Sequence, residues 1–256
     1  MKTIKMIDMT LRESAINREA SLTFKEKLET ARCLNRLKVD AIELPPIIDG
    51  KADQLCNKTI ASLVNTAVSA TVGMTPESVA EAWESIREAK QPQLHFIAPV
   101  SPVQMEYTCH KKAPAMLETI SEIVAKCRFY CENVEFSAVD ATRSERPFLY
   151  QVIAAAIDAG ANRITLCDNA GTMLPEEFAQ FIDDVCANVP SIASTELYVQ
   201  VSDEMHMAMA CAASAIGHGA MGVKCTAAPL GFPTLEEMAH FARVKGSDMG
   251  IAIGLR

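Results

Sequence analysis

The chain has 256 residues, of which 49% are hydrophobic, and a formal net charge of −8 at pH 7. The length suits one barrel of eight βα units or two ordinary domains, and the negative charge argues against a nucleic-acid-binding surface. No apolar run is long enough to cross a bilayer, and the N-terminus begins directly in a strand-like segment, so we expect a cytoplasmic protein without a signal peptide. The nine cysteines are scattered through predicted elements, as is typical of reduced thiols.

Short β-rich runs alternate with amphipathic stretches along the chain, which predicts βα units and a parallel sheet. The predicted strands are 3–8, 40–44, 67–72, 93–99, 134–138, 163–167, 196–201 and 222–226. The predicted helices are 23–37, 53–65, 78–90, 115–131, 147–159, one that begins at 175, 205–216 and 234–244. No linker or repeat divides the chain, so we predict one α/β domain over residues 1–256, a single (β/α)8 TIM barrel. A doubly wound open sheet is the alternative, but the first turn is not glycine-rich.

The first predicted strand ends at Asp8, and we expect Thr10, Arg12 and Glu13 to follow in a loop before the first helix. A carboxylate and a guanidinium beside a buried strand cost too much desolvation to serve only as packing. In a barrel of parallel strands, the chemistry lies at the carboxyl ends of the strands. Further candidates at this end are Glu43, His95, Thr142, Arg143 and Asp168. For each of them, a structural ion pair or a rim position is an equally good interpretation.

The segment Asp8–Glu13 reads Asp-Met-Thr-Leu-Arg-Glu and resembles the Asp-x-Thr-Leu-Arg-Asp signature of the DRE-TIM family. This family includes the isopropylmalate and homocitrate synthases and HMG-CoA lyase. The likeness covers about residues 4–238, and the motifs at 136–143 and 175–178 follow in the family order. It implies enolate or carbon–carbon bond chemistry on a small 2-oxo or hydroxy carboxylate. It also implies that Asp8 is a metal ligand and that Arg12 orients the substrate carboxylate or enolate.

The sequence also departs from the family pattern. The His-x-His motif of the seventh strand reads Gln200-Val-Ser202, so both imidazole metal ligands are replaced, and Val139 stands where the synthases carry an acidic residue. The Gly-Glu-Arg-x-Gly-Asn motif reads Ala-Pro-Leu-Gly-Phe-Pro over residues 228–233. The chain also ends where the synthases continue into the C-terminal subdomains that supply a catalytic His and the acyl-CoA lid. We therefore expect a divergent member of the family.

Oxygen ligands could replace the lost imidazoles. If the seventh strand continues past residue 201, strand alternation puts Glu204 on the same face as Gln200. Asp8, Gln200 and Glu204 would then form an all-oxygen set, which suits Mg²⁺ or Mn²⁺ better than Zn²⁺. Two functions stay open: an acyltransferase or an aldolase/lyase-type enzyme, or a non-catalytic barrel that binds a small carboxylate or a partner protein. A homodimer or a separate partner subunit is compatible with either.

Two further residues lie in the eighth predicted strand. Lys224 could form a Schiff base if it were desolvated inside the barrel, but a strand lysine that reaches the rim is the more common arrangement, and we expect that here. Cys225 lies within the strand rather than in a mobile loop, so we expect a buried packing residue.

Overall fold

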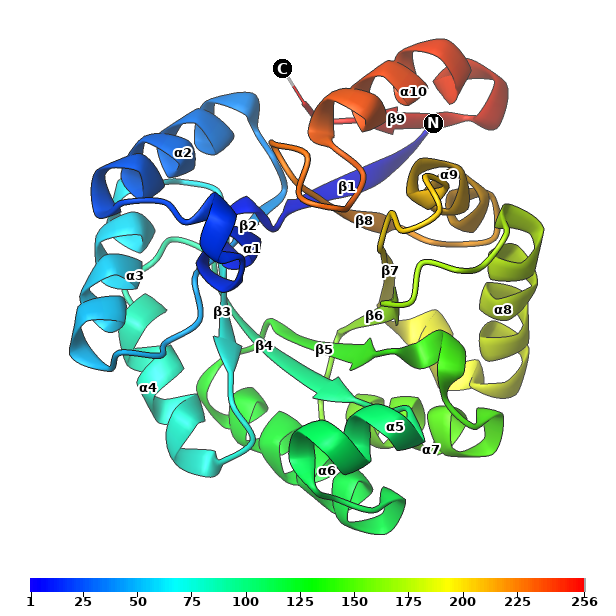
Figure 1. Cartoon of the computed structure of the whole chain (residues 1–256), viewed down its shortest axis with the longest axis horizontal. Coiled ribbons are helices and arrows are strands. Elements are labelled where there is room, and N and C mark those ends of the chain that lie inside the picture. The colour runs from blue at the N-terminus through cyan, green and yellow to red at the C-terminus, as the bar shows by residue number, and fades with distance from the viewer. Residues whose placement is uncertain (256) are drawn as a thin grey trace.

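The computed structural model describes residues 1–255, so the last residue of the expected domain, at 256, lies outside the described part. Its parallel sheet closes into a barrel ringed by helices (Figure 1). The strands are β1 (Lys2–Asp8), β2 (Ala41–Glu43), β3 (Ala67–Val72), β4 (Pro92–Pro99), β5 (Val134–Val139), β6 (Arg163–Asp168), β7 (Glu196–Val201), β8 (Gly222–Cys225) and β9 (Ile251–Ile253). Strands β2 to β8 pair in chain order, and β1 pairs with both β8 and β2. The predicted single (β/α)8 TIM barrel is confirmed.

The helices pack outside the strands and carry the chain from the end of one strand back to the start of the next. The α-helices are α1 (Thr10–Ile16), α2 (Phe24–Leu37), α3 (Lys51–Leu63), α4 (Pro76–Ile86), α5 (Pro102–Gln104), α6 (Ala113–Tyr130), α7 (Arg146–Asp158), α8 (Pro175–Asn188), α9 (Ala208–Gly217) and α10 (Leu235–Met249). Short turns of 3₁₀ or π-helix are η1 (Arg18–Ala20), η2 (Met105–Cys109), η3 (Ala141–Arg143) and η4 (Pro190–Ser194). No helix within residues 1–255 is long and apolar enough to span a membrane.

The starts of two major helices follow from local sequence signals. Thr23 and Glu26 form a capping box at the start of α2, and Thr234 and Glu237 form another at the start of α10. In each box the threonine hydroxyl accepts a backbone N–H of the first turn, and the glutamate accepts the threonine's own N–H. These signals explain why the predicted starts of the two helices agree with the structure to within about one residue.

Helix α1 and strand β9 differ from expectation, as do α5 and the short 3₁₀ and π turns, which were not predicted. The residues after Asp8 form helix α1 rather than a loop, so the predicted loop is wrong. Asp8 accepts the backbone N–H of Thr10 at 2.9 Å, which satisfies one of the donors that every helix start leaves free. Strand β9 was not predicted, and it pairs with the first half of β1 outside the closed barrel. Thr10 and Arg12 are therefore held by a short helix at the carboxyl end of β1.

The strands bury both of their faces. The outer face packs against the helices in the main hydrophobic core, whereas Ile7, Ala41, Ala67 and Tyr198 form a small separate apolar cluster. Because side chains alternate along a strand, Glu43 shares the face of Ala41 and lies nearer the carboxyl end of β2. Beyond the apolar cluster, the barrel interior is therefore occupied by polar and charged side chains.

We predict that Gly222→Ala destabilises the barrel, because a Cβ at this position would lie 2.5 Å from Cδ1 of the Tyr198 ring and 3.0 Å from Cδ1 of Ile7. Overpacking of this kind costs about 1–3 kcal/mol of unfolding free energy. Gly217→Ala is the control, since a Cβ added there would have no atom within 4 Å. Urea denaturation should show a lower midpoint only for Gly222→Ala, and equal midpoints for the two variants would contradict this packing.

Candidate functional site

Arg12 lies on α1 with its guanidinium turned toward β2 and β7. Nη1 pairs with Oε2 of Glu43 at 2.5 Å, and Nη2 donates to Oε1 of Gln200 at 3.0 Å. Nε donates to Oε1 of Glu13 at 2.9 Å. The residue is only 5% exposed. Burial opposes its positive charge, but the carboxylates of Glu43 and Glu13 outweigh burial and raise the pKa of Arg12. Arg12 is therefore a fixed cation at the carboxyl end of the barrel.

Lys224 points into the barrel interior and is fully buried, so the expected rim position is wrong. Its Nζ forms an ion pair with Oε1 of Glu43 and another, at 2.5 Å, with Oε1 of Glu135. Lys224 pairs with Ile7 in the register of β8 and β1. Ile7 belongs to the small apolar cluster inside the barrel. The neighbouring Cys225 is fully buried, as predicted.

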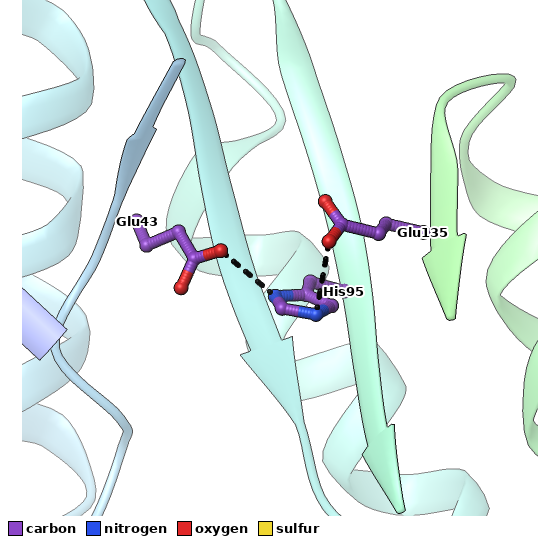
Figure 2. A group of neighbouring side chains, drawn as sticks. All are labelled: Glu43, His95 and Glu135. Atoms are coloured by element: carbon purple, nitrogen blue, oxygen red, sulfur yellow. Dashed lines mark ion pairs between the residues drawn. The ribbon is translucent and has the colours of Figure 1, made fainter. Parts of the chain in front are cut away.

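His95 lies between the two acidic side chains (Figure 2). Its Nδ1 is 3.5 Å from Oε1 of Glu43, and its Nε2 is 3.4 Å from Oε1 of Glu135. Burial lowers the pKa of His95 to about 4, so the ring is neutral at pH 7 and these contacts are not ion pairs. Nε2 lies 2.6 Å from Oγ of Ser137, whose hydroxyl donates to Glu135. We therefore assign the ring proton to Nε2, which leaves the lone pair of Nδ1 facing Glu43.

The surrounding cations keep Glu43 and Glu135 ionised. Burial alone would raise both pKa values, but Arg12 and Lys224 lower the pKa of Glu43. His95 and Lys224 likewise lower the pKa of Glu135, and Lys224 supplies the charge at pH 7 because the ring is neutral. We call Arg12, Glu43, His95, Glu135 and Lys224 the interior charge cluster. Its two cations match its two carboxylates, as burial of charge requires.

Asp8 is fully buried beside this cluster and is held by Thr10. Its Oδ1 accepts the backbone N–H of Thr10 and its Oδ2 accepts the hydroxyl, both at 2.9 Å. Oγ1 of Thr10 in turn accepts the N–H of Ala227 at 2.7 Å. Burial raises the pKa of Asp8 to about 7. Among its described contacts there is no positively charged group. An added cation could therefore bind the Asp8 carboxyl group without displacing another cation.

The donor atoms of Glu43, His95 and Glu135 lie within 4.8 Å of one another, close enough to share a metal ion. However, Lys224 already pairs with both carboxylates through the oxygens that face His95. Because its ammonium supplies the positive charge there, a metal ion does not fit this group while Lys224 is present.

The sequence-predicted ligand set is placed differently. Strand β7 ends at Val201, so its alternation does not reach Glu204, which is exposed. Oε1 of Gln200 accepts a hydrogen bond from Arg12. In the described part of the chain, no contact joins Asp8, Gln200 and Glu204. Asp8 is the buried carboxyl group of the set, and this predicted metal site stays a prediction.

The remaining predicted residues form a second group at the ends of β5 and β6. The hydroxyl of Thr142 donates to Oδ1 of Asp168 at 2.8 Å, and Nε of Arg143 donates to Oδ1 of Asp140 at 2.7 Å. Asp140 is fully buried with a left-handed φ of 60°, and Oγ of Ser101 donates to it at 2.5 Å. The side chain of Arg143 is 51% exposed. This group therefore offers a reachable cation at the rim.

Glu135 is the cluster member that the sequence-based candidates omitted, and Lys224 was considered but expected at the rim. Both lie within short strands between apolar residues, at Val-Glu-Phe and Val-Lys-Cys. In a barrel ringed by helices, both faces of a strand are buried, so a charged residue in mid-strand needs a buried partner of opposite sign. That rule could have identified the pair.

The interior charge cluster does not line the cavity at the start of α7. A cavity of about 220 Å³ lies between the segment after β4 and the start of α7, with Met105, Lys111 and Phe148 in its lining. It contains no member of the interior charge cluster. We place the candidate site over the barrel axis, where buried charges that cost free energy are gathered.

Comparisons with known proteins identify the family of this chain. A family model described as HMGL-like matches residues 3–253. The 2-isopropylmalate synthase of Aquifex aeolicus is 37% identical over 96% of this chain and 48% of its own length. That of Ruminiclostridium cellulolyticum is 33% identical over 98% of this chain and 48% of its own. This chain thus spans about half the length of these curated relatives.

The fold is shared with solved structures of low sequence identity. The HMG-CoA lyase of Brucella melitensis superposes with a TM-score of 0.81 at 14% identity, covering 100% of this chain and 94% of that one. The hydroxymethylglutaryl-CoA lyase of Pseudomonas aeruginosa gives a TM-score of 0.82 at 14% identity, covering 100% and 88%. At this level of identity the likeness concerns the barrel itself.

We predict that Asp8→Asn removes a pH dependence of stability. The folded-state pKa of Asp8 is about 7 and its ordinary value is 3.8. Between these values the unfolded chain ionises Asp8 and the folded protein does not, so wild-type stability falls as pH rises from about 4 to about 7. The wild-type penalty at pH 8 is on the order of 4 kcal/mol.

Urea denaturation of metal-free protein at pH 4.5 to 8 tests this. The stability of Asp8→Asn relative to wild type should increase with pH and level off above pH 7. Both proteins contain His95, whose lowered pKa makes stability rise with pH between about 4 and 6.5. This contribution is the same in wild type and Asp8→Asn, so it cancels when their free energies of unfolding are subtracted. A difference that is constant with pH would contradict the buried, unpaired state of Asp8.

Proposed function

The chain belongs to the HMGL-like family, and from that premise we propose that it binds a small 2-oxo or hydroxy carboxylate at the barrel mouth and promotes enolate or carbon–carbon bond chemistry on it. The supporting observation is the fixed, buried guanidinium of Arg12 at the carboxyl end of β1. The curated relatives bear the name 2-isopropylmalate synthase. The reaction proposed here is of this general kind, with a different substrate or acyl donor.

Arg12 is suited to orient the carboxylate. A guanidinium has five N–H donors, and the contacts with Glu13, Glu43 and Gln200 fix its plane. Nη1 carries two N–H groups, and its described partner is Glu43 alone, so one donor can turn to a substrate oxygen. The side chain keeps 6% of its surface exposed. A preorganised donor of this kind stabilises the negative charge that develops on an enolate oxygen.

The group at the ends of β5 and β6 supplies the other proposed contacts with the substrate. Arg143 is half-exposed and is oriented by the buried Asp140. It can pair with a second carboxylate of a dicarboxylic substrate. Thr142 and Asp168 are joined to each other, and we assign them to positioning of the rim. Glu13 pairs with Arg12 at 2.8 Å and its side chain is 18% exposed, so we assign it as the candidate proton acceptor.

A divalent cation fits this arrangement at Asp8. Mg²⁺ is often held by one or two carboxylates together with water and substrate oxygens, and the described surroundings of Asp8 provide one such carboxylate. The replacement of both family imidazoles by Gln200 and Ser202 favours Mg²⁺ or Mn²⁺ over Zn²⁺. When bound, the ion would polarise the substrate carbonyl as a Lewis acid.

A non-catalytic barrel that binds a small carboxylate or a partner protein is the second candidate. It is favoured by Gln200, because this residue stands at a family metal-ligand position but uses its oxygen to accept a hydrogen bond from Arg12. The two candidates differ in turnover rather than in binding, so an assay of proton abstraction separates them.

We predict that wild-type protein binds a 2-oxo acid and exchanges its C3 hydrogens for deuterium. Calorimetry and proton NMR in D2O with pyruvate, 2-oxobutyrate, 2-oxoisovalerate and 2-oxoglutarate measure the two properties. Arg12→Ala should weaken binding on the order of 10- to 100-fold, the value of a charge-assisted hydrogen bond. Arg12→Lys, which keeps the charge but loses the planar fork, should fall between wild type and Arg12→Ala.

Arg87→Ala is the matched control, because Arg87 pairs on the outer surface with Glu84 and is 49% exposed. It should bind and exchange like wild type. Binding without exchange would assign the chain to the non-catalytic candidate. Equal dissociation constants for wild type and Arg12→Ala would remove Arg12 from the site.

We also predict weak binding of Mg²⁺ or Mn²⁺ that depends on Asp8. Calorimetric titration with Mg²⁺, Mn²⁺ and Zn²⁺ should show a preference for the first two, lost in Asp8→Asn, because a hard oxygen set favours them. Glu204→Gln tests whether that exposed residue joins the ligand set. Tight Zn²⁺ binding that Asp8→Asn abolishes would show that nitrogen or sulfur ligands complete the site.

A further inference from the structure

The group of Glu43, His95 and Glu135 has the donor atoms of a metal site but already contains a cation. We propose that the ammonium of Lys224 occupies the cation position of this group. The native protein then binds no divalent metal there, and removal of the Lys224 side chain opens a metal site. This proposal concerns the barrel interior and is independent of the substrate.

The contacts show that Lys224 and a metal ion would use the same atoms. Lys224 pairs with Oε1 of Glu43 and with Oε1 of Glu135, at 2.5 Å for the latter. These two oxygens are also the ones that face the ring of His95, as Figure 2 shows. An entering metal ion would therefore have to displace the ammonium from both carboxylates.

The charge count favours the ammonium over a metal ion. The cluster contains two carboxylates, Glu43 and Glu135, and two permanent cations, Arg12 and Lys224. A dication added beside them would leave an uncompensated double positive charge in a fully buried space, which is strongly unfavourable. Without Lys224 the same space carries an excess negative charge, which favours a cation.

The histidine supplies the third donor. Nδ1 of His95 is buried and has no hydrogen-bond partner in the described residues. With the ring proton assigned to Nε2, which lies 2.6 Å from Oγ of Ser137, the free lone pair of Nδ1 lies on the side of Glu43. Two carboxylate oxygens and one imidazole nitrogen are a ligand set suited to Zn²⁺ or Co²⁺, with the remaining position open to water. The deleted lysine side chain leaves room for that ion.

Titration with Co²⁺ tests the proposal, because a bound Co²⁺ ion absorbs visible light. The proteins are wild type, Lys224→Ala and Lys224→Met. Both substitutions remove the charge, but Met refills the space and Ala does not. We expect one equivalent of Co²⁺ to bind to Lys224→Ala only, with a rise in Tm on the order of 5 °C at saturation. Neither wild type nor Lys224→Met should show a Co²⁺ spectrum from this site.

The double variant Lys224→Ala with His95→Gln locates the ion. It should lose the Co²⁺ spectrum, since Gln lacks the imidazole nitrogen. If Lys224→Ala does not fold alone, the proposal requires Co²⁺ to restore its fold. Absence of both the spectrum and the restored fold would overturn the proposal. A Co²⁺ spectrum in wild type that His95→Gln abolishes would overturn it equally.

Discussion

The pairing of Lys224 with Glu43 and Glu135 is the interaction on which the barrel interior depends. Three strands, β2, β5 and β8, each place one fully buried charge at this point. Removal of any one of these charges alone destabilises the fold, because the loss of one partner of a buried pair costs about 3–5 kcal/mol. The pairing therefore fixes which residues of β2, β5 and β8 lie opposite one another. Hydrophobic residues of similar volume could fill the same space, but they would not specify this arrangement.

The same pairing reaches the proposed substrate site through Glu43. One oxygen of Glu43 pairs with Lys224 and the other pairs with Arg12. Arg12 is further held by Glu13 and by Gln200. The guanidinium of Arg12 at the barrel mouth is thus oriented by Glu43, which is itself held by Lys224. All three of these contacts with Arg12 come from side chains of the protein itself.

The sequence was sufficient to predict the barrel, because strand and helix periodicities, capping boxes and motif order all agreed. It also placed Asp8 and Arg12 at the carboxyl end of β1. It did not predict helix α1, because its seven residues are too few to show a clear helical period. The position of Lys224 was also missed: its place in mid-strand indicated a buried partner, but Glu43 and Glu135 lie on strands distant in sequence. Pairing across a closed barrel depends on register, which no local pattern shows.

A crystal structure of wild-type protein purified without chelator, with anomalous data collected at the zinc and manganese edges, tests the central claim most directly. The account predicts continuous density for Lys224 up to Glu43 and Glu135, with no anomalous peak among Glu43, His95 and Glu135. An anomalous peak at that position, with the Lys224 side chain turned away from both carboxylates, would contradict it.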